Sequence, residues 1–451
     1  MNRYLSKQIN KLIPGGAHTY SRGDDQFSSN TPALFKRGKG AYLFDLKENK
    51  YLDYGMALRA INIGYDEEKI SAAAINEIKK GNNLTRASMT ELKAAKKFTS
   101  LIKSADMVKF AKNGSSAVTA AVKLARAYTG KEIILRCANH PFFSYDDWFI
   151  GSTVIKKGVT KSTINDTKLF KYNDIESVKK LVKKYKNKIA CIVLEASTTE
   201  CPTYRDKNVP CCGKKRCELI GKKNFLKEIE QICKNNEIVF ILDEMITGFR
   251  WDLQGAQNFY NVKPDLSTFG KAMSNGYSIA AVCGSKKIME YGSIKKNNQE
   301  RVFLMSTTYG GEMSSFGAFL ETIKFMKKNR VIEKNWNYGK KLKNEMNLIF
   351  KKYNIYNDIN VSGIDCAPIL NFYNKDKSIS FELKTYFQQE MIKHKILMPW
   401  ISLCYNHKEK EFLKTINALE KVSFLINKAL KYGIKSYIKG PIVKSVFRRF
   451  N

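Results

Sequence analysis

The sequence predicts an α/β fold in which a central, mostly parallel sheet is flanked by helices, with a smaller α+β domain built from both termini. Three observations lead to this fold class. Short apolar runs alternate with amphipathic segments through the middle of the chain, the last third does not keep this alternation, and 451 residues exceed the size of one ordinary core. We therefore expect two or three compact parts.

The first part of the chain reads as short strands followed by two helices. Residues 34–54 contain short apolar and aromatic runs that are interrupted by glycines and by a polar turn, as in a group of short strands. Residues 69–81 and 90–103 carry apolar side chains at helical spacing and predict amphipathic helices.

The central segment predicts a regular succession of strands and helices. Its apolar runs are strand candidates, at 107–111, 132–136, 190–195, 238–243 and 265–269. Helices are expected between them, at 116–128, 174–185 and 224–235. Such alternation favours a mostly parallel sheet with helices on both faces.

The C-terminal part has a different pattern, with two long helices expected at 315–329 and 332–352 and short strands and helices after them. The N-terminal strands also differ from the central pattern, so we expect them to pack with this part. The predicted boundaries are 1–65 for the N-terminal segment that packs with the small domain, 66–320 for the large domain and 321–451 for the C-terminal small domain.

The chain is strongly basic, with a formal net charge of +36 from 78 Lys and Arg against 42 Asp and Glu. The basic pairs, such as Lys179-Lys180 and Lys183-Lys184, recur at intervals between apolar residues at helical spacing, which indicates solvated helix faces. We therefore expect no nucleic-acid partner. No apolar run reaches the roughly 18–20 residues that span a bilayer, and the first residues lack the apolar core of a secretory signal. The expectation is a soluble, cytoplasmic protein without a membrane partner.

Four of the ten cysteines form a local cluster, at Cys201, Cys211, Cys212 and Cys217. These thiolates either bind a zinc ion or belong to a polar loop with incidental thiols. The spacing is not the paired C-x-x-C form of most zinc sites, so the sequence predicts no metal.

Three polar motifs lie where α/β proteins bind ligands, beyond the carboxyl ends of strands. The turn at 114–116 is Gly-Ser-Ser at the start of a helix, and is either a phosphate cradle or an ordinary helix cap. Asp243 ends an apolar strand, where a carboxylate either pairs with a group such as a protonated pyridine nitrogen or caps the next element. Lys271 follows a short strand and a glycine, and is either an amine that forms a Schiff base or a surface lysine.

The order of these motifs resembles the signature of the class III (ω-type) aminotransferases. L-D-E-M-I-T-G-F-R, which contains Asp243, is followed by D-L-S-T-F-G-K, which ends at Lys271, 28 residues later. The resemblance is strongest to the branch that contains glutamate-1-semialdehyde 2,1-aminomutase and covers nearly the whole chain. Further matching segments are I-P-G-G-A-H-T-Y-S-R at 13–22, S-T-T-Y-G-G-E at 306–312 and S-L-C-Y-N-H at 402–407.

The resemblance implies a transferase of fold type I that depends on pyridoxal 5'-phosphate (PLP). It implies that Lys271 forms the Schiff base with PLP and that Asp243 binds the pyridine nitrogen. The other implied cofactor contacts are the phosphate turn at Gly114, Ser115 and Ser116, a ring-stacking residue at Phe142, Glu195 beside the substrate pocket, Met245 on the other face of the ring, and Thr308. Relatives usually have Tyr-His-Gly where this chain has Phe-Phe-Ser at 142–144, so the stacking ring is kept and its hydroxyl is lost.

Thr308 matches a threonine that contacts the phosphate of the neighbouring subunit's cofactor, which implies a homodimer. Arg22 matches an arginine that binds the substrate carboxylate in the aminomutase branch. Arg59 and Arg86 lie in pocket-forming stretches of the resemblance, and each is either a substrate contact or a structural ion pair.

The implied function is transfer of an amino group from an amino acid donor to an aldehyde or keto acceptor. The chain resembles aminotransferases that accompany enzymes of bacterial surface-polysaccharide biosynthesis. The alternative is an aminomutase, which moves the amino group within one molecule and needs the same lysine and carboxylate. A third reading is a protein of this fold that only binds or scaffolds, and the intact pair of Lys271 and Asp243 argues against it.

Overall fold

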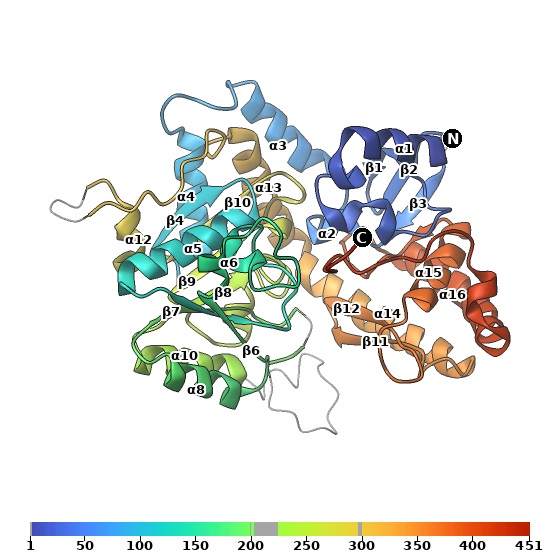
Figure 1. The fold of residues 1–451 in the computed structure, drawn as a ribbon. Coiled ribbons are helices and arrows are strands. Elements are labelled where there is room, and N and C mark those ends of the chain that lie inside the picture. The colour runs from blue at the N-terminus through green and yellow to red at the C-terminus, as the bar shows by residue number, and fades with distance from the viewer. Residues whose placement is uncertain (1, 199, 203–223, 296–299) are drawn as a thin grey trace. The chain divides into compact units, whose positions relative to one another are not determined.

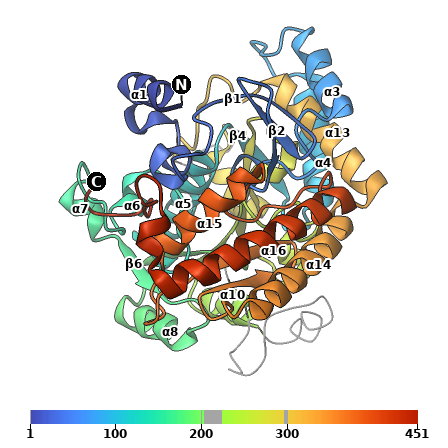
Figure 2. The same cartoon turned by 90° about the vertical axis from the view of Figure 1, so that its right-hand side faces the viewer.

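The computed structural model describes residues 2–198, 200–202, 224–295 and 300–451. The chain forms two compact units. The small unit consists of residues 1–67 and 333–448, and the large unit consists of residues 68–332 with 449–451. Both combine helices with a sheet (Figures 1 and 2).

A seven-stranded sheet lies at the centre of the large unit (Figure 1). Its order is β4 (Met107–Ala111), β10 (Ala280–Gly284), β9 (Leu266–Phe269), β8 (Val239–Glu244), β7 (Ile189–Glu195), β5 (Ile133–Cys137) and β6 (Thr167–Phe170). The strands from β9 to β6 are parallel, and β10 runs antiparallel to both β4 and β9. The predicted mostly parallel sheet is therefore confirmed, with β6 and β10 as strands that the sequence did not indicate.

Every residue of β7 and β8 is buried, which explains why these strands have nearly continuous apolar sequences. The longer helices of the large unit are α3 (Glu68–Ile78), α4 (Met89–Leu101), α5 (Gly114–Thr129), α8 (Ile175–Lys184), α10 (Phe225–Asn235) and α13 (Met313–Asn329). α8 and α10 lie together on one side of the sheet, and α5 packs on the other side (Figure 1). Two faces covered by helices leave the strand ends as the part of the sheet that can meet a ligand.

Short elements connect these helices and strands. They are α6 (Asp147–Ile150), α7 (Lys161–Ile164), α11 (Ala256–Phe259), α12 (Lys286–Met289) and the 3₁₀ turns η4 (Lys271–Ser274) and η5 (Glu290–Gly292). The segment from η4 to β10 and the segment before α13 matter for the site, because both lie next to the end of β4.

The small unit contains a four-stranded sheet in the order β1 (Phe35–Lys39), β2 (Tyr42–Asp45), β3 (Lys50–Asp53) and β13 (Ile396–Leu397). β13 lies parallel to β3, with Ile396 opposite Leu52, so one sheet joins strands from the two ends of the chain. This arrangement confirms the predicted α+β domain built from both termini.

Helices and a hairpin complete the small unit. They are α1 (Asn2–Leu12), η1 (Pro14–Gly16), η2 (Tyr20–Arg22), η3 (Asp24–Gln26), α2 (Met56–Arg59), α14 (Val331–Lys352), β11 (Ile359–Ile364), β12 (Ala367–Phe372), α15 (Phe381–Lys393), α16 (Glu409–Tyr432) and η6 (Ile434–Tyr437). α14 and α16 lie side by side in Figure 2, and exposed ion pairs such as Lys352 Nζ with Glu420 Oε2 at 2.9 Å join them. Beneath them lies a large apolar core that includes Leu342, Phe387 and Leu419.

Among the helices that the structure describes, none combines the length and the apolar character needed to cross a bilayer. Of the cysteine cluster, Cys211, Cys212 and Cys217 lie outside the described residues, and Cys201 is buried. No group of three or more metal-ligating side chains occurs within the described ranges.

Candidate active site

Three polar residues lie next to one another at the carboxyl edge of the large sheet. In the strand register, Glu195 of β7 is opposite Asp243 of β8, and Asp243 is opposite Thr268 of β9. All three side chains are buried. Parallel strands thus bring together residues that lie far apart in the sequence, at the edge where α/β sheets bind ligands.

Two hydrogen bonds from nearby residues hold the carboxylate of Asp243 in place. Its Oδ1 accepts a hydrogen bond from the Met245 backbone N–H at 2.8 Å and another from the Thr268 hydroxyl at 3.0 Å. Burial raises the pKa of Asp243 to about 6, against the lowering effects of the Met245 amide, the Lys271 charge and the Thr268 hydroxyl. Both bonds use Oδ1, so Oδ2 can accept a bond from a further N–H donor.

Lys271 begins the 3₁₀ turn η4, directly after Gly270 and the end of β9. Its backbone φ is 41°, in the left-handed region that side-chain-bearing residues rarely adopt. Its charge acts on the carboxylate of Asp243, which places the two groups in one electrostatic neighbourhood. A strained lysine beside a buried carboxylate is typical of a functional site.

Met245 lies close to two glycines, of which Gly114 begins α5 and Gly270 precedes η4. A Cβ added to Gly114 would lie 2.9 Å from the Met245 Sδ, and one added to Gly270 would lie 2.7 Å from the same atom. Met245 also packs against Ala111, Ala117 and Ala280. Glycine at both positions therefore lets the turn at 114–116 and the turn before Lys271 approach one side chain.

The turn at 114–116 starts helix α5. Asn113 caps the helix, since its Oδ1 accepts a bond from the Ser116 N–H at 2.9 Å. The N–H groups of Gly114 and Ser115 are in the first turn, where a helix offers no internal acceptor, so that they can bind an anion. The Ser115 Oγ accepts a weak bond from the Tyr145 N–H at 3.3 Å, which ties the turn to the segment that carries Phe142.

Phe142 is 45% exposed and meets Phe149 edge to face, with ring centroids 5.6 Å apart. Close by in sequence, His140 is buried, and its Nδ1 accepts a bond from the Glu195 N–H at 3.0 Å. Burial lowers the pKa of His140 to about 3, so the ring is neutral and carries its proton on Nε2. In the part of the chain that the structure describes, that Nε2 has no hydrogen-bond partner.

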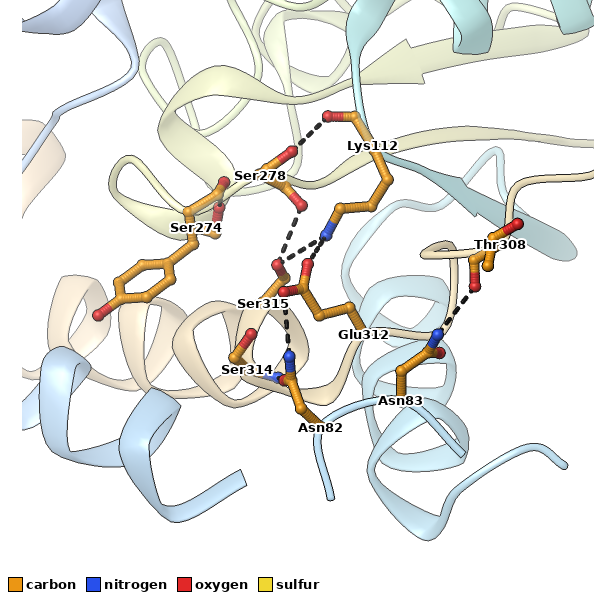
Figure 3. Close-up of polar contacts among 10 residues, drawn as sticks. Asn82, Asn83, Lys112, Ser274, Ser278, Thr308, Glu312, Ser314 and Ser315 are labelled. Atoms are coloured by element: carbon orange, nitrogen blue, oxygen red, sulfur yellow. Dashed lines mark hydrogen bonds and ion pairs between the residues drawn. The ribbon is translucent and has the colours of Figure 1, made fainter. Parts of the chain in front are cut away.

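Thr308 lies on the exposed loop that precedes α13. Its carbonyl accepts a bond from Asn83 Nδ2 at 3.0 Å (Figure 3). A few residues later, Glu312 forms an ion pair with Lys112, the residue that precedes the Asn113 cap. The loop is therefore connected to the turn at 114–116 through side chains of the same unit.

Comparison with known sequences identifies the chain. A sequence model of the family described as "Aminotransferase class-III" matches residues 24–370. The chain belongs to the class III aminotransferases. It is therefore an enzyme of a PLP-dependent family, as the resemblance of its motifs predicted.

Two relatives align with this chain over nearly their whole length. The 3-aminobutyryl-CoA aminotransferase of Cloacimonas acidaminovorans is 29% identical, with 94% of this chain and 97% of that protein covered. The glutamate-1-semialdehyde 2,1-aminomutase of Wigglesworthia glossinidia brevipalpis is 30% identical, with 93% and 96% covered. Both reaction types considered from the sequence thus occur among similar proteins.

Solved structures confirm the fold. The FumI protein of Sphingopyxis sp. MTA144, in its PLP internal aldimine form, superposes with a TM-score of 0.82 at 22% identity and covers 95% of this chain and 97% of its own. An omega-transaminase from Sphaerobacter thermophilus gives 0.78 at 18% identity, with 95% and 98% covered. The expected fold type I of PLP-dependent transferases is confirmed.

The residues at the carboxyl edge fit the PLP of this aminotransferase family. Asp243 offers a buried oxygen to a protonated ring nitrogen, and α5 offers N–H groups to a phosphate. A Cβ at position 114 would crowd the Met245 Sδ at 2.9 Å, so the glycine lets the first residue of the turn approach this side chain closely. The charge of Lys271 lies near enough to influence Asp243.

The two arginines predicted to contact substrate belong to the small unit. Arg22 ends η2 and is exposed, and Arg59 ends α2 and is partly buried. All four residues of α2 have positive φ, from 42° at Met56 to 70° at Arg59, so the element is a left-handed turn. Arg86, in the large unit, is exposed.

Sequence reasoning missed several residues that shape the carboxyl edge of the large sheet and the left-handed turn α2. Thr268 was inside a predicted strand, and only the register with β8 shows that its hydroxyl binds Asp243. Lys112 and Glu312 lie at the edges of the motifs around 114–116 and 306–312, but the sequence assigned neither of them a role. Asp53, which holds the left-handed turn, lies at the end of β3 much as Asp243 lies at the end of β8, and that parallel was available in the sequence.

Proposed function

We propose that the chain is an aminotransferase that takes an amino group from an amino acid donor and passes it to an aldehyde or keto acceptor. The observation that carries this proposal is the buried Asp243, hydrogen-bonded through one oxygen only and under the influence of the Lys271 charge, beside a helix start built for an anion. A scaffold protein has no need to bury such a carboxylate, because burial of a charge costs free energy.

When bound, PLP supplies an aldehyde that takes up an amino group and an aromatic ring that withdraws electrons from the substrate α-carbon. Lys271 would hold the cofactor through its amine, and once released the same Nζ would move the proton at that α-carbon. Asp243 would keep the ring nitrogen protonated. Its carboxylate is suited to this role, because burial strengthens a charge-assisted bond.

The remaining cofactor contacts follow the sites described above. Gly114, Ser115 and Ser116 would bind the phosphate through the first turn of α5. Phe142 and Met245 would pack on the two faces of the ring, and Glu195 would border the substrate. Half-exposure of Phe142 supports this assignment, since a stacking ring needs a free face.

Thr308 would contact the phosphate of a neighbouring subunit, in a homodimer. Its exposed position on the loop before α13 supports a contact with a second copy. The seven free, buried cysteines among the described residues fit a reducing compartment such as the cytoplasm.

Arg22, Arg59 or both would bind the carboxylate of the substrate, because the planar guanidinium group suits a two-point contact with a carboxylate. The left-handed backbone of α2 supports a role for Arg59, since four consecutive residues in that region cost free energy that ordinary packing rarely demands. We also propose that the acceptor is a carbonyl compound of surface-polysaccharide biosynthesis, by resemblance to aminotransferases of that context.

The second candidate function is intramolecular amino transfer of the glutamate-1-semialdehyde 2,1-aminomutase type. The relative from Wigglesworthia glossinidia brevipalpis, aligned over nearly its whole length, favours it. The cofactor residues serve both reactions equally.

A half-reaction separates the two functions. The PLP-loaded protein is mixed with single amino acids in the absence of any acceptor, and the released cofactor is identified by mass. An aminotransferase converts PLP to pyridoxamine phosphate with at least one donor and forms the matching keto acid in equal amount. Conversion of glutamate-1-semialdehyde to 5-aminolevulinate without a donor would instead establish the aminomutase, and failure of both reactions would overturn the proposal.

A further inference from the structure

An ion pair joins two loops of the large unit that are 200 residues apart in sequence. The ammonium group of Lys112 contacts the carboxylate of Glu312 and donates a hydrogen bond to the Ser315 Oγ at 3.0 Å (Figure 3). The two charged side chains are only 19% and 27% exposed, so water screens the pair less than it screens the surface pairs of this chain.

The pair belongs to a network that includes a third segment. Asn82 donates to the Glu312 Oε1 at 3.1 Å, and its own Oδ1 accepts a bond from the Ser314 N–H at 3.0 Å. Asn83 donates to the Thr308 carbonyl at 3.0 Å. The start of α13 and the loop before it are therefore fixed to residues 82–83.

A fourth segment, which follows Lys271, meets the same network. The Ser278 hydroxyl donates to the Lys112 carbonyl at 2.7 Å, and the Ser315 hydroxyl donates to the Ser278 carbonyl at 3.0 Å. Figure 3 shows that Ser278, Ser315 and Glu312 are each bonded to Lys112. Lys112 is thus the residue at which the end of β4, the segment after η4 and the start of α13 are held together.

Both partners occupy positions from which they influence a proposed phosphate contact. Lys112 immediately precedes the Asn113 cap of α5, and Glu312 lies four residues after Thr308. Partial burial opposes ionisation of Glu312, but the bonds from Lys112 and Asn82 hold its pKa below its usual range, so this carboxyl group is ionised at neutral pH. A charge-assisted contact of this kind is stronger than a neutral one.

We infer that Lys112 and Glu312 are a positioning pair for the PLP phosphate. The pair fixes the turn at 114–116, which binds the phosphate in its own subunit, to the loop that carries Thr308, which contacts the phosphate of the neighbouring subunit. Both phosphate contacts are thereby kept in one relative position. The inference rests on the proposed phosphate roles of Gly114, Ser115 and Thr308. Neither member of the pair touches the cofactor in this account.

The test compares binding of PLP with binding of pyridoxal, which has the same aldehyde and ring but no phosphate. Lys112→Met removes the charge with little change in length, and Glu312→Gln keeps an oxygen that can accept the Asn82 bond. We expect each variant to raise the dissociation constant for PLP about tenfold, or about 1.4 kcal/mol, and the constant for pyridoxal less than about twofold.

The matched control is Lys343→Met, which breaks the buried pair of Lys343 with Asp365 in the small unit, 2.5 Å between Nζ and Oδ1. It removes a lysine of similar burial and should leave the ratio of the two constants unchanged. The reversed pair, Lys112→Glu with Glu312→Lys, restores an attraction between the same positions and should recover at least part of the preference for PLP. If one single variant does not fold, the other single variant and the reversed pair decide the outcome.

Two failures can be told apart. If the unaltered protein binds PLP no better than pyridoxal, the proposed phosphate site itself is wrong. If it prefers PLP but the variants keep the same ratio of constants while losing thermal stability, the ion pair is only structural and the inference is overturned.

Discussion

The two units each bury an aspartate at the end of a strand, and the two carboxylates are used differently. Burial raises the pKa of both Asp243 and Asp53 to about 6, because it disfavours the ionised form of each carboxyl group. Asp243 accepts its two bonds through Oδ1 alone. Asp53 uses both oxygens: Oδ1 accepts the Gly55 N–H at 2.6 Å, and Oδ2 accepts the Met56 N–H and the Tyr65 hydroxyl.

The backbone carbonyl of Asp53 also has a hydrogen-bond partner. His407 donates from Nε2 to the Asp53 carbonyl at 3.0 Å, because its Nδ1 already accepts the Cys404 N–H at 3.1 Å. Its ring is stacked against Tyr54, with centroids 4.5 Å apart. Asp53 therefore holds the start of the left-handed turn that leads to Arg59, whereas both bonds of Asp243 use Oδ1, which leaves Oδ2 for the ring nitrogen that we propose it binds. Burial and pKa are alike for the two carboxylates, and the number of oxygens already bonded is what differs.

The largest expected effect is at Lys271. Lys271→Ala should lower the rate of the half-reaction by at least about a thousandfold, because it removes both the covalent attachment and the proton-moving amine. The rate is measured by formation of pyridoxamine phosphate in a single turnover. Lys286→Ala, at an exposed position of α12 in the same unit, is the control and should react at the unaltered rate. A fully active Lys271→Ala variant would remove this lysine from the mechanism.

The next effect is at Asp243. Asp243→Asn should lower the rate of the half-reaction about a hundredfold or more while much of the PLP stays bound, since a neutral amide does not keep the ring nitrogen protonated. Cofactor content by absorbance and rate by rapid mixing give the two quantities separately. An unchanged rate with full cofactor content would show that Asp243 has no part in the reaction.

A smaller effect concerns stability without cofactor, where the two aspartates should differ. With a folded pKa of about 6, ionised Asp243 destabilises the fold at pH 7.5, and Asp243→Asn should stabilise the cofactor-free protein by up to about 3 kcal/mol. Since the raised pKa makes the unaltered fold gain stability as the pH falls through 6, the advantage of the variant should vanish near pH 4.

Asp53→Asn should stabilise the cofactor-free protein less than Asp243→Asn does, and the difference should be about 1–3 kcal/mol. The reason is that an amide nitrogen in place of Oδ2 cannot accept the hydrogen bond from the Met56 N–H. Urea unfolding of both cofactor-free variants at pH 7.5 and pH 4 measures the difference. Equal stabilisation by the two substitutions would contradict the distinction drawn between the carboxylates.

The smallest effect is at the left-handed turn. Ala57 has φ 47° and ψ 50°, so Ala57→Gly should relieve backbone strain and stabilise the protein by up to about 1 kcal/mol. Ala72→Gly, at an exposed position of the right-handed helix α3, should destabilise by about 0.5–1 kcal/mol. The same substitution thus has opposite signs at the two places, and thermal unfolding of both variants shows whether it does.

Much of the large unit was predictable because its strands are apolar runs whose ends carry polar residues. Those runs predicted β7 and β8 within one residue, and hence the positions of Glu195 and Asp243 at strand ends. β10 was not predicted, since A-A-V-C-G is short and made of small residues that do not distinguish a strand from a turn. Its antiparallel place between β4 and β9 is a tertiary property.

The left-handed turn and the Lys112–Glu312 pair could not be predicted for different physical reasons. Residues 56–59 contain no glycine, so no local preference indicates positive φ, and the conformation depends on the bonds from Asp53 and on packing. The ion pair joins positions 200 residues apart, and nothing in a chain with 78 Lys and Arg marks Lys112 as the partner of Glu312. Contacts of this kind arise from the fold as a whole.

The central claim, that Lys271 is the residue that holds PLP beside Asp243, is tested most directly by chemical trapping. The PLP-loaded protein is treated with borohydride and digested, and the peptides are analysed by mass spectrometry. The account predicts one phosphopyridoxyl group per chain, on the peptide that contains Lys271, and none in the Lys271→Ala variant. A stoichiometric label on another lysine, or no label on a protein that has bound PLP, would contradict it.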